Sequence, residues 1–556
     1  MNQPADLVVA NAAVYTCDPQ NTWAESFAVA QGRIVAVGTA QEIRELAGPG
    51  AEVIDLGGRM VMPGLCDVHI HLGYGGNQVA WELTVWPTDT LDQILDKVAA
   101  HAGALGPDEW IVGGIVGSTV FDKVSEGGCQ DLLDAAAGGR PVLLRDESMH
   151  NRWLNSRALE IIGVGNDTPD PDGGAYVRDA TGKLTGVLLE MASKVAEDAV
   201  HAAIANPEER LRVSYRTALD VINSFGVTAV QDAATLEHGL KTLASLDDDG
   251  ELSAWVVASL PARPFFEDGA VGEDLFAVAG THRRTHVRPD FVKLFLDGVP
   301  MTRTSAMLAP YICHGSHEDP GHTGEPYWSL DDLVAVLERN HELGLSTKMH
   351  CSGDGAVRRA LDGIEVIRKA HGDTTIFQIA HAGLIDPADL SRFAKLGVAV
   401  DASPYMWYPG PILESSANQI PSETLARSFP FNDLVSDGTL VAAGSDWPVV
   451  PLPNPWVGLE TLVTRANPDP AVPGTLNPAQ SLSLPAAIAA FTSDSATAVG
   501  LGDTIGRIRP GYSADFIVLN HNLFDIRSEQ IHQTQVELTY FQGRQVYDRA
   551  AAASDR

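Results

Sequence analysis

Five separated fragments of the chain carry side chains of the kinds that bind metal ions. The first, Pro63–His71, contains His69 and His71, and the others contain Lys293, His350, His381 and Asp446. Together they offer four imidazoles, one carboxylate and one lysine amine that could carry CO2. Such a set can hold two divalent ions and provide hydroxide at neutral pH, because a metal lowers the pKa of bound water to about 7. The chemistry indicated is metal-dependent hydrolysis.

The spacing of these residues suits strands of a barrel. Side chains at positions i and i+2 of a strand share a face, so His69 and His71 would project together. Each of the other residues lies within, or at the end of, a later strand-like run, and barrel active sites gather at the carboxyl ends of the strands. Imidazole and carboxylate ligands favour Zn²⁺, with Mn²⁺, Fe²⁺ or Co²⁺ as alternatives.

Each residue taken singly has a simpler interpretation. An isolated His-x-His pair is a weak signal, and a histidine at a strand end is more often a hydrogen-bonded polar residue than a ligand. Lys293 inside an apolar run is either a lysine that extends to solvent or a carbamate that bridges two cations. Asp446 alone suits a helix N-cap. Their joint occurrence in barrel order argues against coincidence, although His69, His71, His381 and Asp446 might hold one ion without the lysine.

The middle of the chain alternates strand-like and helix-like segments, which predicts parallel β/α units. Eight candidate strands match the number in a closed (β/α)8 TIM-type barrel. They are residues 65–71, 226–233, 254–260, 290–298, 345–351, 377–382, 397–403 and 439–446.

Two additions to the barrel are expected. Short strands with turn signals at both ends predict one small β-sandwich built from residues 1–60 and 501–556, with the barrel domain over 61–500. The gap between the first and second candidate strands is several times one β/α unit. A large insertion after the first barrel strand, at about residues 75–210, accounts for it.

Composition narrows the class of protein. The 556 residues carry a net charge of −34, from 72 acidic and 38 basic side chains, which argues against nucleic acid and anionic membrane as partners. The five cysteines are scattered without CxxC spacing, which fits a reducing cytoplasm. The first residues show neither a signal peptide nor a membrane span.

Several fragments resemble one known family. They are VMPGLCDVHIH (61–71), MHNRWLNSRAL (149–159), GGAYVRDATGKLTGVLLE (173–190), VKLFLDGVPMTRTSAML (292–308), MHCSGDGAV (349–357), IAHAGLIDPADLSRFAKLGV (379–398), AGSDWPV (443–449) and GRIRPGYSADFIVLN (506–520). The chain resembles the amidohydrolase superfamily, specifically its YtcJ-like branch (amidohydrolase 3 type), which includes N-substituted formamide deformylases.

The resemblance implies the sandwich and barrel, and it carries over a metal ligand set, residue by residue. The implied ligands are His69, His71, Lys293, His350, His381 and Asp446, with two Zn²⁺ and a CO2-derived carbamate on Lys293. A homodimer is expected only from the family. Two departures concern pocket polarity and substrate choice: Ala380 precedes His381 where relatives often have Glu, and Ser403 precedes Pro404 where they often have Gln.

The hypothesis for the mechanism assigns two catalytic side chains. Asp446 would accept a proton from the attacking water and deliver it to the leaving amine. By resemblance, His150 would donate to the tetrahedral oxyanion; its alternative is a structural histidine of the insertion. An apolar or aromatic pocket for a small substrate is expected from Trp86, Trp153, Tyr405, Trp407 and Trp447, which might instead pack the loops.

The leading prediction is therefore hydrolysis of a C–N amide bond, as in a deacylase, deformylase or amidase, through a metal-bound hydroxide. Hydrolysis of another bond on the same scaffold (an ester, a cyclic amide or a deamination) is the first alternative, because fold does not determine function. A non-catalytic metal-binding or regulatory protein is the alternative of another class. It would be favoured by a missing ligand, and all six are present.

Overall fold

The computed structural model describes residues 4–146, 151–264, 269–313 and 319–554. The chain divides into two compact units. The barrel unit comprises Met1–Leu72 and Leu219–Arg556, and the inserted unit comprises Gly73–Ala218. The insertion expected at about residues 75–210 falls inside the second range.

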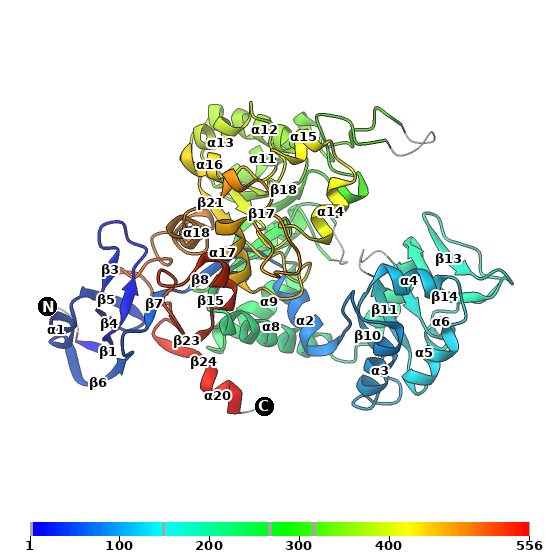
Figure 1. Cartoon of the computed structure of the whole chain (residues 1–556), viewed down its shortest axis with the longest axis horizontal. Coiled ribbons are helices and arrows are strands. Elements are labelled where there is room, and N and C mark those ends of the chain that lie inside the picture. Colours follow the sequence, from blue (N-terminus) through cyan, green and yellow to red (C-terminus); the bar gives the residue numbers. More distant parts are fainter. Residues whose placement is uncertain (1–3, 147–150, 265–268, 314–318, 555–556) are drawn as a thin grey trace. The chain divides into compact units, whose positions relative to one another are not determined.

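The barrel unit contains one sheet of eight strands, in the order β21-β20-β19-β18-β17-β16-β15-β8, and every strand pair in it is parallel (Figure 1). All eight predicted strands are present, and the predicted TIM-type class is confirmed. Their bounds are β8 Leu65–Ile70, β15 Val227–Ala233, β16 Trp255–Pro261, β17 Val287–Phe295, β18 Ser346–Cys351, β19 Phe377–His381, β20 Val398–Ala402 and β21 Val441–Ala443.

The first and last strands of this sheet meet at their carboxyl ends. Asp446 donates its backbone N–H to the His69 carbonyl at 2.6 Å, and His71 donates to the Trp447 carbonyl at 2.8 Å. These bonds bring the loop after β21 against the end of β8, so two fragments distant in sequence share one edge of the barrel.

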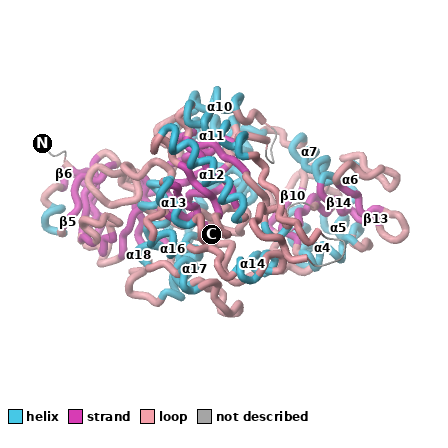
Figure 2. Tube along the Cα trace, turned by 90° about the horizontal axis from the view of Figure 1, so that it is seen from above, coloured by secondary structure: helices cyan, strands magenta, loops and turns pink. Residues whose placement is uncertain are grey.

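Helices follow the barrel strands in the β/α alternation that the sequence predicts. Figure 2 shows α11, α12 and α13 outside the strands. The buried positions of α12 recur at helical spacing, for example Val357, Leu361 and Ile364, which places one apolar face against the sheet. The bounds are α9 Glu237–Asp248, α10 Glu273–Ala279, α11 Leu330–Glu342, α12 Asp354–His371, α13 Leu390–Leu396, α14 Pro411–Ala417, α16 Phe431–Ser436, α17 Pro455–Thr464, α18 Leu484–Ala490 and α19 Ser493–Ala498.

Two further sheets are built from the ends of the chain, as predicted. One has the order β5-β4-β1-β6 and the other β24-β23-β22-β7-β2-β3. Phe27 of the first sheet and Phe516 of the second pack edge to face within one apolar core, and their ring centroids are 5.0 Å apart. The bounds are β1 Ala5–Ala10, β2 Ala13–Tyr15, β3 Trp23–Ala24, β4 Ser26–Ala30, β5 Arg33–Gly38, β6 Ala47–Asp55, β7 Met60–Pro63, β22 Phe516–Leu519, β23 Val536–Phe541 and β24 Arg544–Asp548.

The inserted unit has its own mixed sheet, in the order β13-β14-β12-β11-β10-β9. A largely buried ion-pair network supports it, in which Arg145 binds Glu82 and Glu197, and Arg152 also binds Glu197. The bounds are β9 Leu83–Thr84, β10 Ile111–Val116, β11 Val142–Asp146, β12 Arg152–Leu154, β13 Gly174–Arg178, β14 Leu184–Glu190, α3 Leu91–Ala102, α4 Ser118–Ser125, α5 Gln130–Ala137, α6 Ser156–Ile161 and α7 Lys194–Ala202. Among the helices that the structure describes, none has both the length and the apolar character needed to cross a bilayer.

A single glycine lets β7 of the sandwich continue directly into β8 of the barrel. A Cβ added at Gly64 would lie 2.1 Å from Thr228 Oγ1 and 2.8 Å from Thr228 Cγ2, in the neighbouring strand β15. Thr228 is itself buried. The buried Thr228 side chain therefore leaves no room for a side chain at position 64.

We expect Gly64→Ala to lower the free energy of unfolding by about 3 kcal/mol, because the methyl group overpacks this contact. Urea denaturation measures the loss. Gly64→Ala/Thr228→Ala, which removes the two closest atoms, should recover part of it. Gly280→Ala, at a site with no atom within 4 Å of the added Cβ, is the matched control and should change stability by less than about 0.5 kcal/mol. Equal stability of Gly64→Ala and the control would contradict this account.

Candidate metal centre

The six predicted ligands lie at the carboxyl ends of the barrel strands. His69 is in β8, Lys293 in β17 and His350 in β18, and His381 is the last residue of β19. His71 and Asp446 follow the ends of β8 and β21. This is the end of the barrel at which such enzymes place their chemistry.

The centre of the cluster is a trio formed by buried His69, buried Asp446 and half-buried His381. His69, His381 and Asp446 each offer one ligand atom, and these atoms lie within 4.8 Å of one another. Lys293 Nζ lies 3.0 Å from His69 Nε2, and His71 Nε2 lies 3.2 Å from Asp446 Oδ1.

His350 lies at the side of this cluster. Its ring centroid is 4.6 Å from that of His381. Its Nε2 is 3.0 Å from the Gly298 carbonyl and 3.2 Å from Ser352 Oγ. The structure thus brings all six residues together, with His350 bonded to the loop after β17.

The electrostatics of the cluster favour neutral imidazoles around an ionised carboxylate. Burial lowers the pKa of His381 to about 3, that of His350 to about 4, and that of His69 well below its usual value. Burial raises the pKa of Asp446, but the surrounding imidazoles, His69 above all, bring it below its usual range. Neutral imidazole and ionised carboxylate are the protonation states that a metal requires of its ligands.

The surroundings of Lys293 favour the neutral form of its amine. Burial and the neighbouring Lys348 cation lower its pKa to about 7. A neutral amine is the form that can add CO2, so this environment fits the carbamate hypothesis. The donor set as a whole (imidazole nitrogens, a carboxylate and an amine in one buried cluster) fits a divalent metal ion.

Two of the predicted ligands lie on backbone that is uncommon for residues with a Cβ. His381 has φ 66° and Asp446 has φ 59°, and Ala382 follows with φ 41°. Left-handed conformations at non-glycine residues cost free energy and persist where the surrounding structure holds them. Here they turn the chain sharply at the strand ends, where the two side chains meet.

Sequence reasoning missed four buried charged residues that support the cluster. Asp67 Oδ1 accepts the backbone N–H groups of His69 and Ser445, both at 3.0 Å. Asp401 Oδ2 lies 2.6 Å from His69 Nδ1. The other two are Lys348 and Asp297. A signal existed for all four, because each is an ionisable residue within a predicted barrel strand, where charge is rarely buried without a partner.

The predicted pocket aromatics have varied surroundings. In the barrel unit Tyr405, Trp407 and Trp447 are buried, and Trp407 packs against Phe429 and the guanidinium of Arg465. In the inserted unit Trp86 is exposed, whereas Trp153 is fully buried in the apolar core and belongs to its packing. His150 lies outside the described residues.

Apolar side chains that the sequence analysis did not select are exposed in the segments that connect the barrel strands to the helices or strands that follow them. They follow β17, β20 and β21, and they are Met301, Leu308, Tyr327, Ile412, Val449 and Leu452. Exposed apolar groups gathered at one end of a barrel are typical of a surface that binds ligands.

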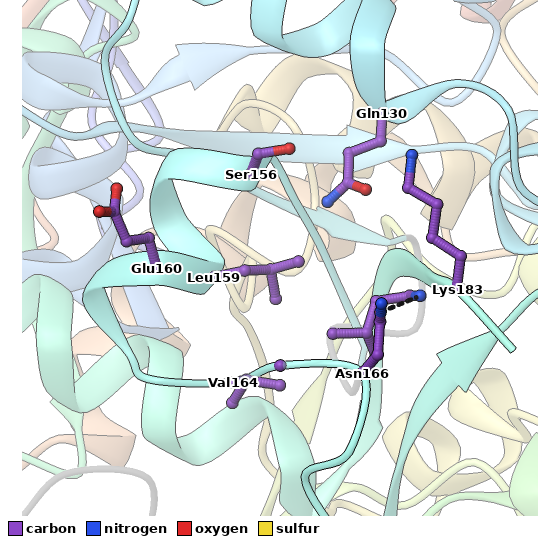
Figure 3. A pocket seen from close by; sticks show the side chains of 9 residues that line it. Gln130, Ser156, Leu159, Glu160, Val164, Asn166 and Lys183 are labelled. Carbon is purple, nitrogen blue, oxygen red and sulfur yellow. Dashed lines mark hydrogen bonds between the residues drawn. The ribbon is translucent and has the colours of Figure 1, made fainter.

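A hollow of about 290 Å³ lies wholly within the inserted unit (Figure 3). Its lining residues are Gln130, Ser156, Leu159, Glu160, Val164, Gly165, Asn166, Lys183 and Leu184. They include no histidine and no cysteine, and Asn166 Oδ1 accepts the backbone N–H of Leu184. With Glu160 as its one carboxylate, the lining of this hollow does not offer the set of ligands that a metal-dependent hydrolase needs.

Comparison with known proteins agrees with the barrel geometry. Residues 52–547 match the model described as the amidohydrolase family. The N-substituted formamide deformylase of Arthrobacter pascens is 27% identical, over 99% of this chain and 100% of that protein. YtcJ of Bacillus subtilis is also 27% identical, over 97% of this chain and 98% of that protein.

Solved structures share the fold. The crystal structure of an uncharacterised metal-dependent hydrolase from Pyrococcus horikoshii superposes with a TM-score of 0.74. It covers 94% of this chain and 99% of its own, with 22% sequence identity.

Asp297 offers a test of how the loops beside His350 are held. Its carboxylate accepts three backbone N–H groups, from Ala306, Ser352 and Gly353, at 2.8 to 3.0 Å. We expect Asp297→Ala to destabilise the protein by about 4 kcal/mol, since three backbone donors, two of them fully buried, lose their acceptor. Asp297→Asn keeps one acceptor oxygen and should cost about half as much. Urea denaturation measures both, and a loss below about 1 kcal/mol in Asp297→Ala would contradict this role.

Proposed function

Because the chain belongs to the amidohydrolase family, we propose that it hydrolyses a C–N amide bond, of the deacylase, deformylase or amidase type, in a small, partly apolar or aromatic substrate. The class of reaction follows from membership: metal-dependent hydrolysis of carbon–nitrogen bonds other than peptide bonds. The observation that carries the finer proposal is the cluster itself, in which Lys293 Nζ lies 3.0 Å from His69 Nε2 and beside Asp446. The full-length similarity to a formamide deformylase supports the choice of amide bond.

In the proposed mechanism the six clustered residues hold divalent metal, most simply two Zn²⁺ ions, with Lys293 carrying a carbamate. When bound, the metal supplies a water of lowered pKa and polarises the substrate carbonyl. Asp446 Oδ1, ionised and 3.2 Å from His71 Nε2, accepts the proton of the attacking water. The same oxygen then delivers that proton to the leaving amine. His150 is proposed as the donor to the oxyanion.

The substrate preference rests on the loops at the strand ends. Six exposed apolar side chains there favour a substrate with an apolar or aromatic part. The net charge of −34 disfavours anionic substrates, because the field of an acidic protein repels them. A homodimer and a cytoplasmic location stay predictions from the sequence.

A matched substrate panel tests the reaction. N-formyl and N-acetyl derivatives of an arylalkylamine and of methylamine are compared with an arylalkyl ester, a cyclic amide and an aminopurine, by amine or ammonia release. We expect kcat/KM to be highest for an arylalkyl amide, because apolar contacts add transition-state binding. Asp446→Asn should lower kcat by about 1,000-fold through loss of the proton acceptor, and should largely retain metal.

Asp437→Asn, an exposed carboxylate outside the cluster, is the control and should keep full activity. Higher kcat/KM for the ester, the cyclic amide or the aminopurine would reject the amide proposal in favour of another bond on the same scaffold. Full activity of Asp446→Asn would reject the role of Asp446.

Metal content tests the ligand set. Purified without chelator and with bicarbonate present, the wild-type chain should hold about two metal equivalents by elemental analysis. Lys293→Ala should hold one or none, because the bridging anion is lost. Lys395→Ala, which removes a lysine of α13, should match the wild type.

One equivalent in both the wild type and Lys293→Ala would make Lys293 a bystander and the centre mononuclear. No metal in either, even after reconstitution with zinc or manganese, would reject the metal centre.

A further inference from the structure

The interior of the barrel contains a second buried lysine that is not among the predicted ligands. Lys348 is fully buried, and its ammonium group contacts four other barrel strands. It donates to the Val68 carbonyl, to Gln378 Oε1 and to Asp401 Oδ2, each at 2.8 Å, and lies 3.4 Å from Gln231 Oε1. Barrel interiors are usually filled by bulky apolar side chains, so this polar layer replaces packing with directed bonds.

Asp401 connects that layer to the metal centre. Its Oδ2 atom receives Lys348 Nζ at 2.8 Å and lies 2.6 Å from His69 Nδ1. Its Oδ1 atom is buried, and it has no hydrogen-bond partner among the described residues. Both interactions of the carboxylate therefore involve Oδ2, which contacts the ammonium group of Lys348 and the imidazole of His69.

This contact determines which nitrogen of His69 is available. A carboxylate can only accept, so Nδ1 carries the proton and Nε2 keeps its lone pair. Nε2 is the nitrogen that faces the cluster, 3.0 Å from Lys293 Nζ and 3.6 Å from Asp446 Oδ1. Hydrogen bonds of this kind orient the histidine ligands of metals and contribute to metal affinity.

Lys348 compensates the negative charge of the buried Asp401 carboxylate. A carboxylate buried without a counter-ion is costly, and Lys348 supplies a cation at contact distance. Lys348 also bonds the Val68 carbonyl, which directly precedes His69 in β8, so it restrains the backbone of the ligand as well as the partner of its ring.

We propose that Asp401 is the positioning residue of the metal centre, with Lys348 as its built-in counter-ion, and that Asp401 acts by accepting the Nδ1 proton of His69. The proposal rests on the proposed function for its metal, but its test needs no substrate.

Two neutral double variants isolate the hydrogen bond from the charge. Lys348→Met/Asp401→Asn and Lys348→Met/Asp401→Leu both lack the buried ion pair. In the first, the Asn oxygen can occupy the place of Oδ2 and still accept from His69, with its NH2 group in the place of the unpartnered Oδ1. In the second, position 401 offers no acceptor. The dissociation constant for Co²⁺ and the visible spectrum of the bound ion are measured for both and for the wild type.

We expect the Asn variant to bind Co²⁺ within about threefold of the wild type with an unchanged spectrum. The Leu variant should bind about 10- to 100-fold more weakly with an altered spectrum. Equal affinity of the two double variants, whether weak or strong, would overturn the positioning role. A wild type that binds neither Co²⁺ nor Zn²⁺ would overturn the proposed metal centre and this inference together, so the two failures are distinguishable.

Two further variants keep the test decisive. Lys348→Met alone leaves Asp401 without its counter-ion, so its melting temperature should fall below that of both double variants; an unchanged value would overturn the counter-ion role. Glu460→Leu removes a buried acceptor from His532 Nδ1, 2.7 Å away and outside the cluster, and should lower stability without changing Co²⁺ affinity. If the Leu double variant does not fold, Lys348→Met/Asp401→Ala takes its place in the same comparison.

Discussion

A charged group inside a barrel must find its partner there, because burial removes the water that would otherwise solvate it. The chain meets this constraint at Asp401, whose one bonded oxygen serves both Lys348 and His69. Asp401 Oδ2 thus contributes both to the stability of the barrel interior, through Lys348, and to the orientation of the His69 ring. The buried imidazoles, the low-pKa carboxylate of Asp446 and the partly neutral amine of Lys293 are further results of the same removal of solvent.

The backbone at the carboxyl ends of the strands determines where the clustered side chains lie. Strands β8 and β21 are far apart in sequence, yet Asp67 binds the backbone on both sides, at His69 and at Ser445. Left-handed backbone at His381 and Asp446 then directs two of the clustered side chains toward the shared centre. Strain of this kind is held by the surrounding bonds, and it marks the places where function outweighs local conformational preference.

The barrel strands and the six clustered residues could be predicted because their signals are local. Apolar runs define the strands, His69 and His71 share a period of two, and Lys293 interrupts an apolar segment. The pairing of Lys348 with Asp401 could not be predicted, since it depends on the register that brings inward side chains of β18 and β20, the two neighbours of β19, together inside the barrel. Trp153 illustrates the same limit: aromatic character alone does not distinguish a pocket wall from the core of the inserted unit.

The strand β7 has a consequence for biosynthesis. It pairs with β2 on one edge and with β22 on the other, so its second edge finds its partner only among residues near 516, and β7 continues into the first barrel strand. During synthesis on a ribosome, the edge of β7 that binds β22 stays unpaired until almost the whole chain has emerged. Long-range pairing of this kind folds slowly, and exposed strand edges invite association. Truncation from the C-terminus would leave that edge exposed permanently, so the last strands cover an edge prone to association as well as completing the sheet.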